Sequence, residues 1–237
     1  MARRVRGAAR WIIRAGRERV LGLSRRGFVR LARPSYKRTL ALVADRAELG
    51  EVLNRRGLLG IGVEVGVKEA EFSELILESW RGERLISVDS WSPADDPALS
   101  QAEHDALREN AGRRLARFGT RSEIRRLTST VAAREISPHS LDFVYIDAAH
   151  DYESISADIA AWFDRVRPGG LLCGHDYYDG MRHGKPYGVR RAVNELCERR
   201  GLKLAVTLFD LPKEASWFVV PSRLSGVPTR GGGREPP

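Results

Sequence analysis

Two aspartates and a histidine stand where the sequence could support acid–base and metal chemistry. Asp147 ends the apolar run that starts at Leu141, and His150 follows three residues later. Asp176 comes shortly after a second apolar run, Leu171-Leu-Cys. Paired carboxylates suit a hard divalent cation such as Mg²⁺, and a histidine whose pKa lies near 7 can take a proton from a hydroxyl group. These residues predict chemistry at a hydroxyl group, with a metal ion as a candidate cofactor.

A glycine and an acid form a second pair, each at the end of an apolar run. Gly66 follows Leu59-Gly-Ile-Gly-Val-Glu-Val, and Asp89 ends Arg84-Leu-Ile-Ser-Val. A glycine at a strand-to-helix turn lets a ligand approach the backbone, and an acid after the next strand can accept both hydroxyls of a ribose. The pair predicts a cofactor that contains a nucleoside.

Glu64 distinguishes between the nucleoside cofactors. The pyrophosphate of a dinucleotide lies over this turn, against a helix N-terminus, where a carboxylate would repel it. S-adenosylmethionine has no phosphate and carries an ammonium and a sulfonium, which a carboxylate stabilises. Gly60 and Gly62 lie inside the expected strand, so the G-x-G-x-x-G pattern of dinucleotide sites is incomplete. The sequence therefore favours S-adenosylmethionine.

Apolar strands and amphipathic helices alternate from about residue 58. This alternation predicts a parallel sheet with helices on both faces, and a ligand site at the carboxyl ends of the strands. The last two strands are joined by a short loop and should pair antiparallel. We expect strands at 59–65, 84–89, 123–129, 141–147, 171–174, 202–209 and 216–220, and helices at 40–54, 69–80, 100–118, 151–166 and 189–200.

Four segments in order resemble the motifs of class I S-adenosylmethionine-dependent methyltransferases. The resemblance covers residues 58–220 and implies an α/β, Rossmann-like fold with a seven-stranded mixed sheet in the order 3-2-1-4-5-7-6. The resemblance implies that the cofactor-binding residues are Glu64, Gly66, Asp89, Ser90, Ser129 and Asp147. The segments are Val63-Glu-Val-Gly, Ser87-Val-Asp-Ser-Trp, Leu141-Asp-Phe-Val-Tyr-Ile-Asp-Ala-Ala-His-Asp-Tyr and Arg167-Pro-Gly-Gly-Leu-Leu-Cys-Gly-His-Asp-Tyr.

Within that class, the chain resembles the metal-dependent small-molecule O-methyltransferases of the macrocin O-methyltransferase-like and caffeoyl-CoA types. The resemblance implies methylation of a hydroxyl on a small molecule, such as a sugar or polyol. By motif position, Asp147 and Asp176 match the metal aspartates of these enzymes and His150 matches the catalytic base.

One position departs from this pattern. Tyr177 stands where those enzymes carry a third metal ligand. Either Asp179 replaces that ligand, or the metal site is weak or absent. His175 is interpreted as a residue that shapes the loop rather than as a ligand.

Positive charge is concentrated at the N-terminus. The first 38 residues hold 13 Lys/Arg and one acidic residue, whereas the remaining chain holds 27 basic and 30 acidic residues. We expect a basic helical extension over 1–57, the catalytic domain over 58–221 and a disordered tail over 222–237. Residues 1–33 could form a lid over the cofactor, contact an anionic membrane surface or remain a solvated helix; nucleic acid is the weakest alternative.

Two other functions stay open. An NAD-dependent oxidoreductase would need the complete glycine pattern and no acid at position 64. A catalytically inactive cofactor-binding or membrane-tethered protein would be consistent with Tyr177. The chain shows no secretory signal, no apolar run near the roughly 20 residues of a membrane span and only two cysteines, so a cytoplasmic location, with peripheral membrane contact as an alternative, is expected.

Overall fold

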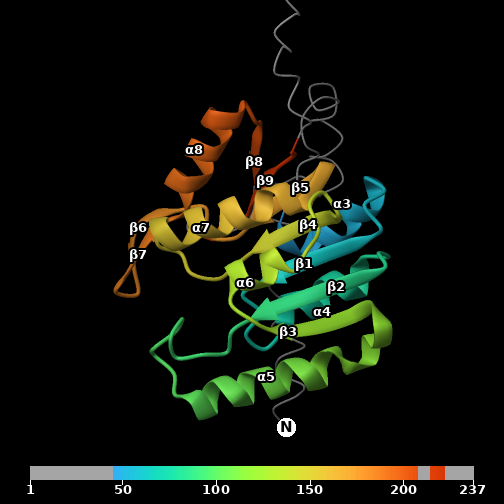
Figure 1. Ribbon diagram of the computed structural model, residues 1–237, viewed down its shortest axis with the longest axis vertical. Helices are drawn as coiled ribbons and strands as arrows, with labels where there is room; N and C mark the ends of the chain where they lie inside the picture. Colours follow the sequence, from blue (N-terminus) through green and yellow to red (C-terminus); the bar gives the residue numbers. More distant parts are fainter. Residues whose placement is uncertain (1–44, 208–213, 222–237) are drawn as a thin grey trace, which may run out of the picture.

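The computed structural model describes residues 45–207 and 214–221, which form a seven-stranded sheet covered by helices on both faces (Figure 1). The strand order is β3-β2-β1-β4-β5-β9-β8. Because β6 and β7 form a separate hairpin, this is the predicted order 3-2-1-4-5-7-6. The strands are β1 (Ile61–Val65), β2 (Arg84–Asp89), β3 (Ser122–Arg126), β4 (Leu141–Ile146), β5 (Val166–Gly174), β8 (Leu204–Val206) and β9 (Trp217–Val219).

Strand direction also follows the prediction. The pairs β3–β2, β2–β1, β1–β4 and β4–β5 are parallel, whereas β9 pairs antiparallel with both β5 and β8. All six residues of β4 are buried, as expected for a central strand covered on both faces. Strands β1 to β5 therefore end along one edge of the sheet, here called the carboxyl edge.

Helices divide between two hydrophobic layers. Val63 and Val65 of β1 belong to the layer under α6, α7 and α8, whereas the neighbouring Glu64 faces α4. In Figure 1 α5 lies along the β3 edge. The helices are α3 (Leu49–Arg55), α4 (Glu71–Ser79), α5 (Gln101–Leu115), α6 (Ser129–Arg134), α7 (Tyr152–Trp162) and α8 (Val189–Arg200), with 3₁₀ turns η2 (Arg46–Glu48), η3 (Ala116–Arg121) and η4 (Phe163–Arg165).

Local sequence explains where these helices begin and end. Ser100 and Glu103 form a reciprocal capping box at the start of α5. Asp151 caps α7 by accepting a hydrogen bond of 2.9 Å from the backbone N–H of Ser154. Gly201 ends α8 in the left-handed conformation, with φ at 61°.

Three segments differ from the expectation. The third strand stops at Arg126, and Ser129 begins the short helix α6 instead of ending the strand. The segment 176–189 contains the hairpin of β6 (Asp179–Arg182) and β7 (Lys185–Gly188), which lies beyond the carboxyl edge (Figure 1). Its turn residues have positive φ, which suits a two-residue hairpin loop.

The third difference concerns α3, which the sequence places in the N-terminal extension. Leu49, Val52 and Leu53 are buried in the same hydrophobic layer as α4, so the packed body begins before residue 58. The basic arm 1–33 and the tail 222–237 lie outside the described residues. Within residues 45–207 and 214–221, no helix combines the length and apolar character needed to cross a membrane.

Candidate functional site

The candidate site is built on the ends of β4 and β5. Asp147 directly follows β4, and its backbone N–H donates to the carbonyl of Val65 at 2.7 Å. His175 and Asp176 directly follow β5, and the N–H of His175 donates to the carbonyl of Ile146 at 3.0 Å. Neighbouring strands therefore fix the backbone of these residues at the carboxyl edge.

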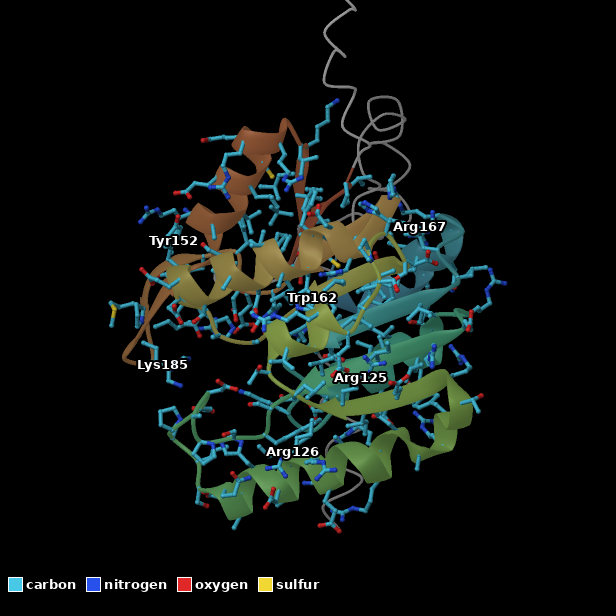
Figure 2. All side chains as sticks on the ribbon, viewed as in Figure 1. Arg125, Arg126, Tyr152, Trp162, Arg167 and Lys185 are labelled. Atoms are coloured by element: carbon cyan, nitrogen blue, oxygen red, sulfur yellow. The ribbon has the colours of Figure 1, made fainter. Side chains whose placement is uncertain are left out.

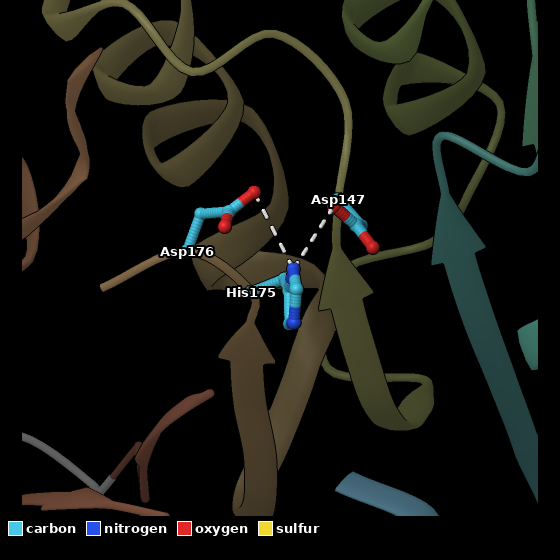
Figure 3. Close-up of side chains that lie close together, drawn as sticks. All are labelled: Asp147, His175 and Asp176. Carbon is cyan, nitrogen blue, oxygen red and sulfur yellow. Dashed lines mark ion pairs between the residues drawn. The ribbon is translucent and has the colours of Figure 1, made fainter. Parts of the chain in front are cut away.

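The side chains of Asp147, His175 and Asp176 converge (Figure 3). Nδ1 of His175 lies 3.7 Å from Oδ1 of Asp147 and 3.4 Å from Oδ2 of Asp176. One donor atom from each residue lies within 4.8 Å of the other two. The structure thus brings the two sequence-predicted aspartates together. It also places His175 beside both aspartates, and the one sequence signal for this placement is that His175 directly precedes Asp176.

His150 approaches the same two carboxylates. Its Nε2 lies 2.9 Å from Oδ2 of Asp176 and 3.6 Å from Oδ1 of Asp147. Its ring stacks on that of Tyr187, with centroids 4.7 Å apart. Burial lowers the pKa of His150, but the neighbouring carboxylates of Asp147 and Asp176 outweigh it and raise the pKa to about 9. In this arrangement the imidazole is protonated at neutral pH.

Two arginines bind the carboxylate oxygens of Asp147 and Asp176 that face away from His175. The sequence analysis did not identify either arginine. Nη1 of Arg46 donates to Oδ2 of Asp147 at 3.3 Å, and Nη1 of Arg182 donates to Oδ1 of Asp176 at 2.9 Å. Burial would raise the pKa of Asp176, but His150 and His175 hold that pKa well below its usual range. Arg46 precedes α3 and Arg182 ends β6, so no sequence motif connects either residue with the site.

Neither candidate for a third oxygen ligand reaches the cluster. The hydroxyl of Tyr177 donates to Oδ1 of Asn194 on α8 at 2.6 Å. Oδ1 of Asp179 accepts the backbone N–H of Arg191 near the start of α8 at 3.0 Å. In this arrangement Asp179 lies outside the cluster of Asp147, His175 and Asp176, and its carboxylate contacts the start of α8.

Gly66 and Asp89 shape the turn after β1. The φ of Gly66 is +86°, and a Cβ there would lie 2.1 Å from the carbonyl oxygen of Asp147. The glycine is thus required by the close approach of the chain after β4. Oδ2 of Asp89 accepts the N–H groups of Val67 and Lys68, at 2.8 and 3.0 Å, and its Oδ1 accepts that of Trp91 at 2.8 Å. Asp89 therefore fixes this turn as well as ending β2.

Glu64 lies inside the fold rather than at the carboxyl edge. Its side chain accepts a hydrogen bond from the hydroxyl of Ser73 on α4, and that hydroxyl lies 2.9 Å from Oγ of Ser87. Burial raises the pKa of Glu64 to about 8, against the opposing effect of the Ser73 hydrogen bond. The group is mostly uncharged at neutral pH, so its position does not support the argument that its charge selects the cofactor.

Ser90 and Ser129, the two serines predicted to bind the cofactor, lie in different environments. Ser90 follows β2, and its backbone carbonyl accepts a hydrogen bond of 3.2 Å from Nε of Arg126. The hydroxyl of Ser129 accepts one of 2.9 Å from Nε1 of Trp162, which Figure 2 labels on α7. Ser129 therefore joins α6 to α7, whereas Ser90 lies at the carboxyl edge.

The β6–β7 hairpin also contacts the loop that follows β2. Nζ of Lys185, labelled in Figure 2, lies 3.1 Å from Oδ1 of Asp96. Both side chains are partly exposed, so this single ion pair adds little stability. It does show that the two segments face each other beyond the carboxyl edge.

Comparisons with known proteins agree with this geometry. A curated relative, the uncharacterized protein y4gI of Sinorhizobium fredii, is 25% identical over 154 residues, which are 64% of this chain but only 16% of the relative's length. The O-methyltransferase TomG of Streptomyces achromogenes, involved in tomaymycin synthesis and solved with S-adenosylmethionine, is similar with a TM-score of 0.54 at 19% identity, covering 78% of this chain and 82% of that one.

The O-methyltransferase of Bacillus cereus, solved in complex with S-adenosylhomocysteine, is similar with a TM-score of 0.52 at 16% identity, covering 74% of this chain and 80% of that one. At this identity, both likenesses establish the fold. The family model described as a methyltransferase domain matches residues 59–177, half of the chain. The chain therefore belongs to the methyltransferase domain family.

Proposed function

We propose that this methyltransferase uses S-adenosylmethionine to methylate a hydroxyl group on a small molecule, with sugars and polyols as the expected acceptor class. The convergence of Asp147, His150 and Asp176 at the carboxyl edge carries the proposal, because it joins an acid–base group to paired carboxylates beside the turn at Gly66. The fold shared with two O-methyltransferases, one solved with S-adenosylmethionine and one with S-adenosylhomocysteine, supports the cofactor and the hydroxyl acceptor.

Asp89 is the residue proposed to hold the ribose. An ionised carboxylate offers about four lone-pair positions, and backbone N–H groups already occupy three of them. Asp89 therefore has room for one ribose hydroxyl rather than two. Gly66 keeps the adjacent turn close to the end of β4, and Ser90 lies beside it. The buried Glu64 and the half-buried Ser129 would support the cofactor site from within the fold.

His150 is proposed to act as the general base that accepts the proton of the acceptor hydroxyl. In the reaction the hydroxyl oxygen forms a bond to the methyl carbon, the carbon–sulfur bond breaks to leave a neutral thioether, and the hydroxyl proton must leave. A protonated His150 cannot take that proton. The proposed role therefore requires the charges of Asp147 and Asp176 to be compensated, which would lower the pKa of the imidazole.

The residues present fit a divalent cation at this place. Two carboxylate oxygens and an imidazole nitrogen converge from Asp147, Asp176 and His175. When bound there, such a cation would compensate the two carboxylates and lower the pKa of a nearby hydroxyl. Asp147 and Asp176 would hold the ion, and His150 would lie beside it.

The test is a methyl-transfer assay with the full chain and methyl-labelled S-adenosylmethionine. Sugars, polyols and catechols serve as acceptors, with and without EDTA. The expected result is release of S-adenosylhomocysteine together with a labelled methyl ether. A label found on nitrogen or carbon, or calorimetry that detects no S-adenosylmethionine binding, would contradict the proposal. Turnover that continues in EDTA would contradict only the metal part of the proposal and would leave the methyltransferase activity in place.

Membership of the methyltransferase domain family argues against the NAD-dependent oxidoreductase that the sequence left open. The catalytically inactive protein is the alternative that the turnover assay decides. The cytoplasmic location, and contact of residues 1–33 with an anionic membrane, stay predictions.

A further inference from the structure

We infer that His175 is itself a metal ligand and makes this site select a transition-metal ion such as Mn²⁺ or Co²⁺ over Mg²⁺. The inference rests on the proposed divalent cation between Asp147 and Asp176. It replaces the expectation that His175 only shapes the loop, and it changes the class of ion expected from the sequence.

The donor atoms have a spacing that one ion could bridge. Adjacent ligands of an octahedral ion are roughly 3 Å apart and opposite ligands roughly 4.2 Å apart, for metal–ligand distances of about 2.1 Å. Nδ1 of His175 lies 3.7 Å from Oδ1 of Asp147 and 3.4 Å from Oδ2 of Asp176, between those two values. Small side-chain adjustments would therefore bring all three atoms onto one ion.

The other oxygen of each carboxylate is already engaged. Arg46 holds the outer oxygen of Asp147 and Arg182 holds the outer oxygen of Asp176. Such outer contacts orient ligands in metal sites and leave the inward oxygens available. The two arginines thus behave as positioning residues for the inward oxygens, Oδ1 of Asp147 and Oδ2 of Asp176.

A second imidazole nitrogen lies beside the same two inward oxygens. Nε2 of His150 is buried and makes no hydrogen bond of acceptable geometry among the described residues, although both inward oxygens lie near it. A buried polar atom without a hydrogen-bond partner is costly, and an ion bound beside it is one of the ordinary explanations. This observation is independent of the arrangement of His175.

The chemistry of the donor set decides which ion is preferred. Mg²⁺ favours oxygen ligands and retains water, whereas imidazole nitrogen suits first-row transition metals. The oxygens expected to complete an all-oxygen set are used elsewhere, since Tyr177 bonds Asn194 and Asp179 caps α8. The set that remains is one nitrogen with two carboxylates.

The experiment measures metal binding to the full chain after treatment with EDTA and dialysis. Calorimetric titration with Co²⁺, Mn²⁺ and Mg²⁺ gives the affinities, and the visible spectrum of bound Co²⁺ reports its ligands. We expect Co²⁺ and Mn²⁺ to bind at least tenfold more tightly than Mg²⁺. His175→Ala should weaken Co²⁺ binding at least tenfold. Equal or tighter binding of Mg²⁺ would overturn the inference, as would the absence of any bound ion, which would indicate an ion-pair cluster alone.

Sites with nitrogen and oxygen ligands generally bind transition metals more tightly than Mg²⁺. A second variant tests whether His175 itself causes the preference. His175→Asp should reduce the ratio of Co²⁺ to Mg²⁺ affinity at least tenfold, whereas His183→Asp, at an exposed turn of the hairpin, should leave it unchanged. A ratio that does not respond to His175→Asp would overturn the inference. If the variants do not fold, the wild-type Mn²⁺ complex still tests it, because electron spin echo spectra without nitrogen modulation would exclude a histidine ligand.

Measuring S-adenosylmethionine binding alongside metal binding distinguishes failure of this inference from failure of the proposed function. If no ion binds but S-adenosylmethionine binds and methyl transfer proceeds, the metal inference fails and the enzyme stands. If Co²⁺ binds through His175 but S-adenosylmethionine does not bind, the metal site stands and the proposed function fails.

Discussion

Nε2 of His150 lies 2.9 Å from Oδ2 of Asp176, joining the chain after β4 to the chain after β5. This pairing, together with Asp147, raises the pKa of His150 to about 9. The group that the sequence selects as a base is therefore held as an acid in this arrangement. Its reactivity depends on what neutralises the two aspartates.

Replacing His150 should abolish turnover without removing the cofactor. His150→Ala is expected to lower kcat about a hundredfold or more, because a positioned acid–base group contributes roughly that much. S-adenosylmethionine affinity, measured by calorimetry, should change less than about twofold. The role fails if His150→Ala turns over near the wild-type rate.

Removing the carboxylate of Asp89 should weaken cofactor binding. Asp89→Ala leaves the N–H groups of Val67, Lys68 and Trp91 without their acceptor, and it removes the proposed ribose contact. We expect S-adenosylmethionine affinity to fall about tenfold or more, in line with the loss of several charge-assisted hydrogen bonds. Asp95→Ala, at an exposed acid in the loop after β2, serves as the control. Equal affinity in wild type and Asp89→Ala would contradict the assignment.

Gly66 and Gly57 provide a matched pair for the close approach at the turn. Both have positive φ, but a Cβ at Gly66 would overlap the backbone of Asp147, whereas a Cβ at Gly57 has no neighbour within 4 Å. Gly57→Ala should cost about 1–2 kcal/mol of unfolding free energy from left-handed strain alone. Gly66→Ala should cost about 3 kcal/mol or more, because overpacking is added. Urea denaturation measures both, and similar losses would show that the contact with Asp147 is unimportant.

Glu64 gives a pH-dependent prediction. Its pKa is raised from 4.5 to about 8 by burial, so across this window the folded protein keeps a proton that the unfolded chain has lost. The unfolding free energy of the wild type should therefore fall as pH rises from about 4.5 to 8, by an amount on the order of a few kcal/mol at most. Glu64→Gln should flatten that part of the profile.

The same variant tests whether the charge of Glu64 matters to the cofactor. At pH 7 the carboxyl group is mostly protonated, so Glu64→Gln should leave S-adenosylmethionine affinity nearly unchanged in calorimetry. A tenfold loss would restore the sequence-based argument that a carboxylate at this position stabilises the cationic cofactor.

The sheet could be predicted because its strands are continuous apolar runs. The run 84–89 was located to the residue, and the order of all seven strands was confirmed. The β6–β7 hairpin was missed because β6, Asp179–Arg182, has little apolar character and no buried residue. Its pairing depends on a turn rather than on burial, so hydrophobic patterning gives no signal for it.

The site was only partly predictable. Asp147, His150 and Asp176 follow strands, so topology alone places them together. Arg46 lies 101 residues from Asp147 in sequence, and no local pattern reports such a contact. The face of the sheet to which the Glu64 side chain points could have been predicted, because side chains alternate along a strand. Its neighbours Val63 and Val65 face the opposite layer.

The β6–β7 hairpin shares no strand pairing with the main sheet, although it supplies Arg182 and Tyr187 to the site. Substitutions in its strands therefore leave the hydrogen-bond ladder of the core intact. The hairpin can therefore change in sequence without unpairing the sheet, whereas substitutions at Arg182 or Tyr187 would act directly on Asp176 and His150.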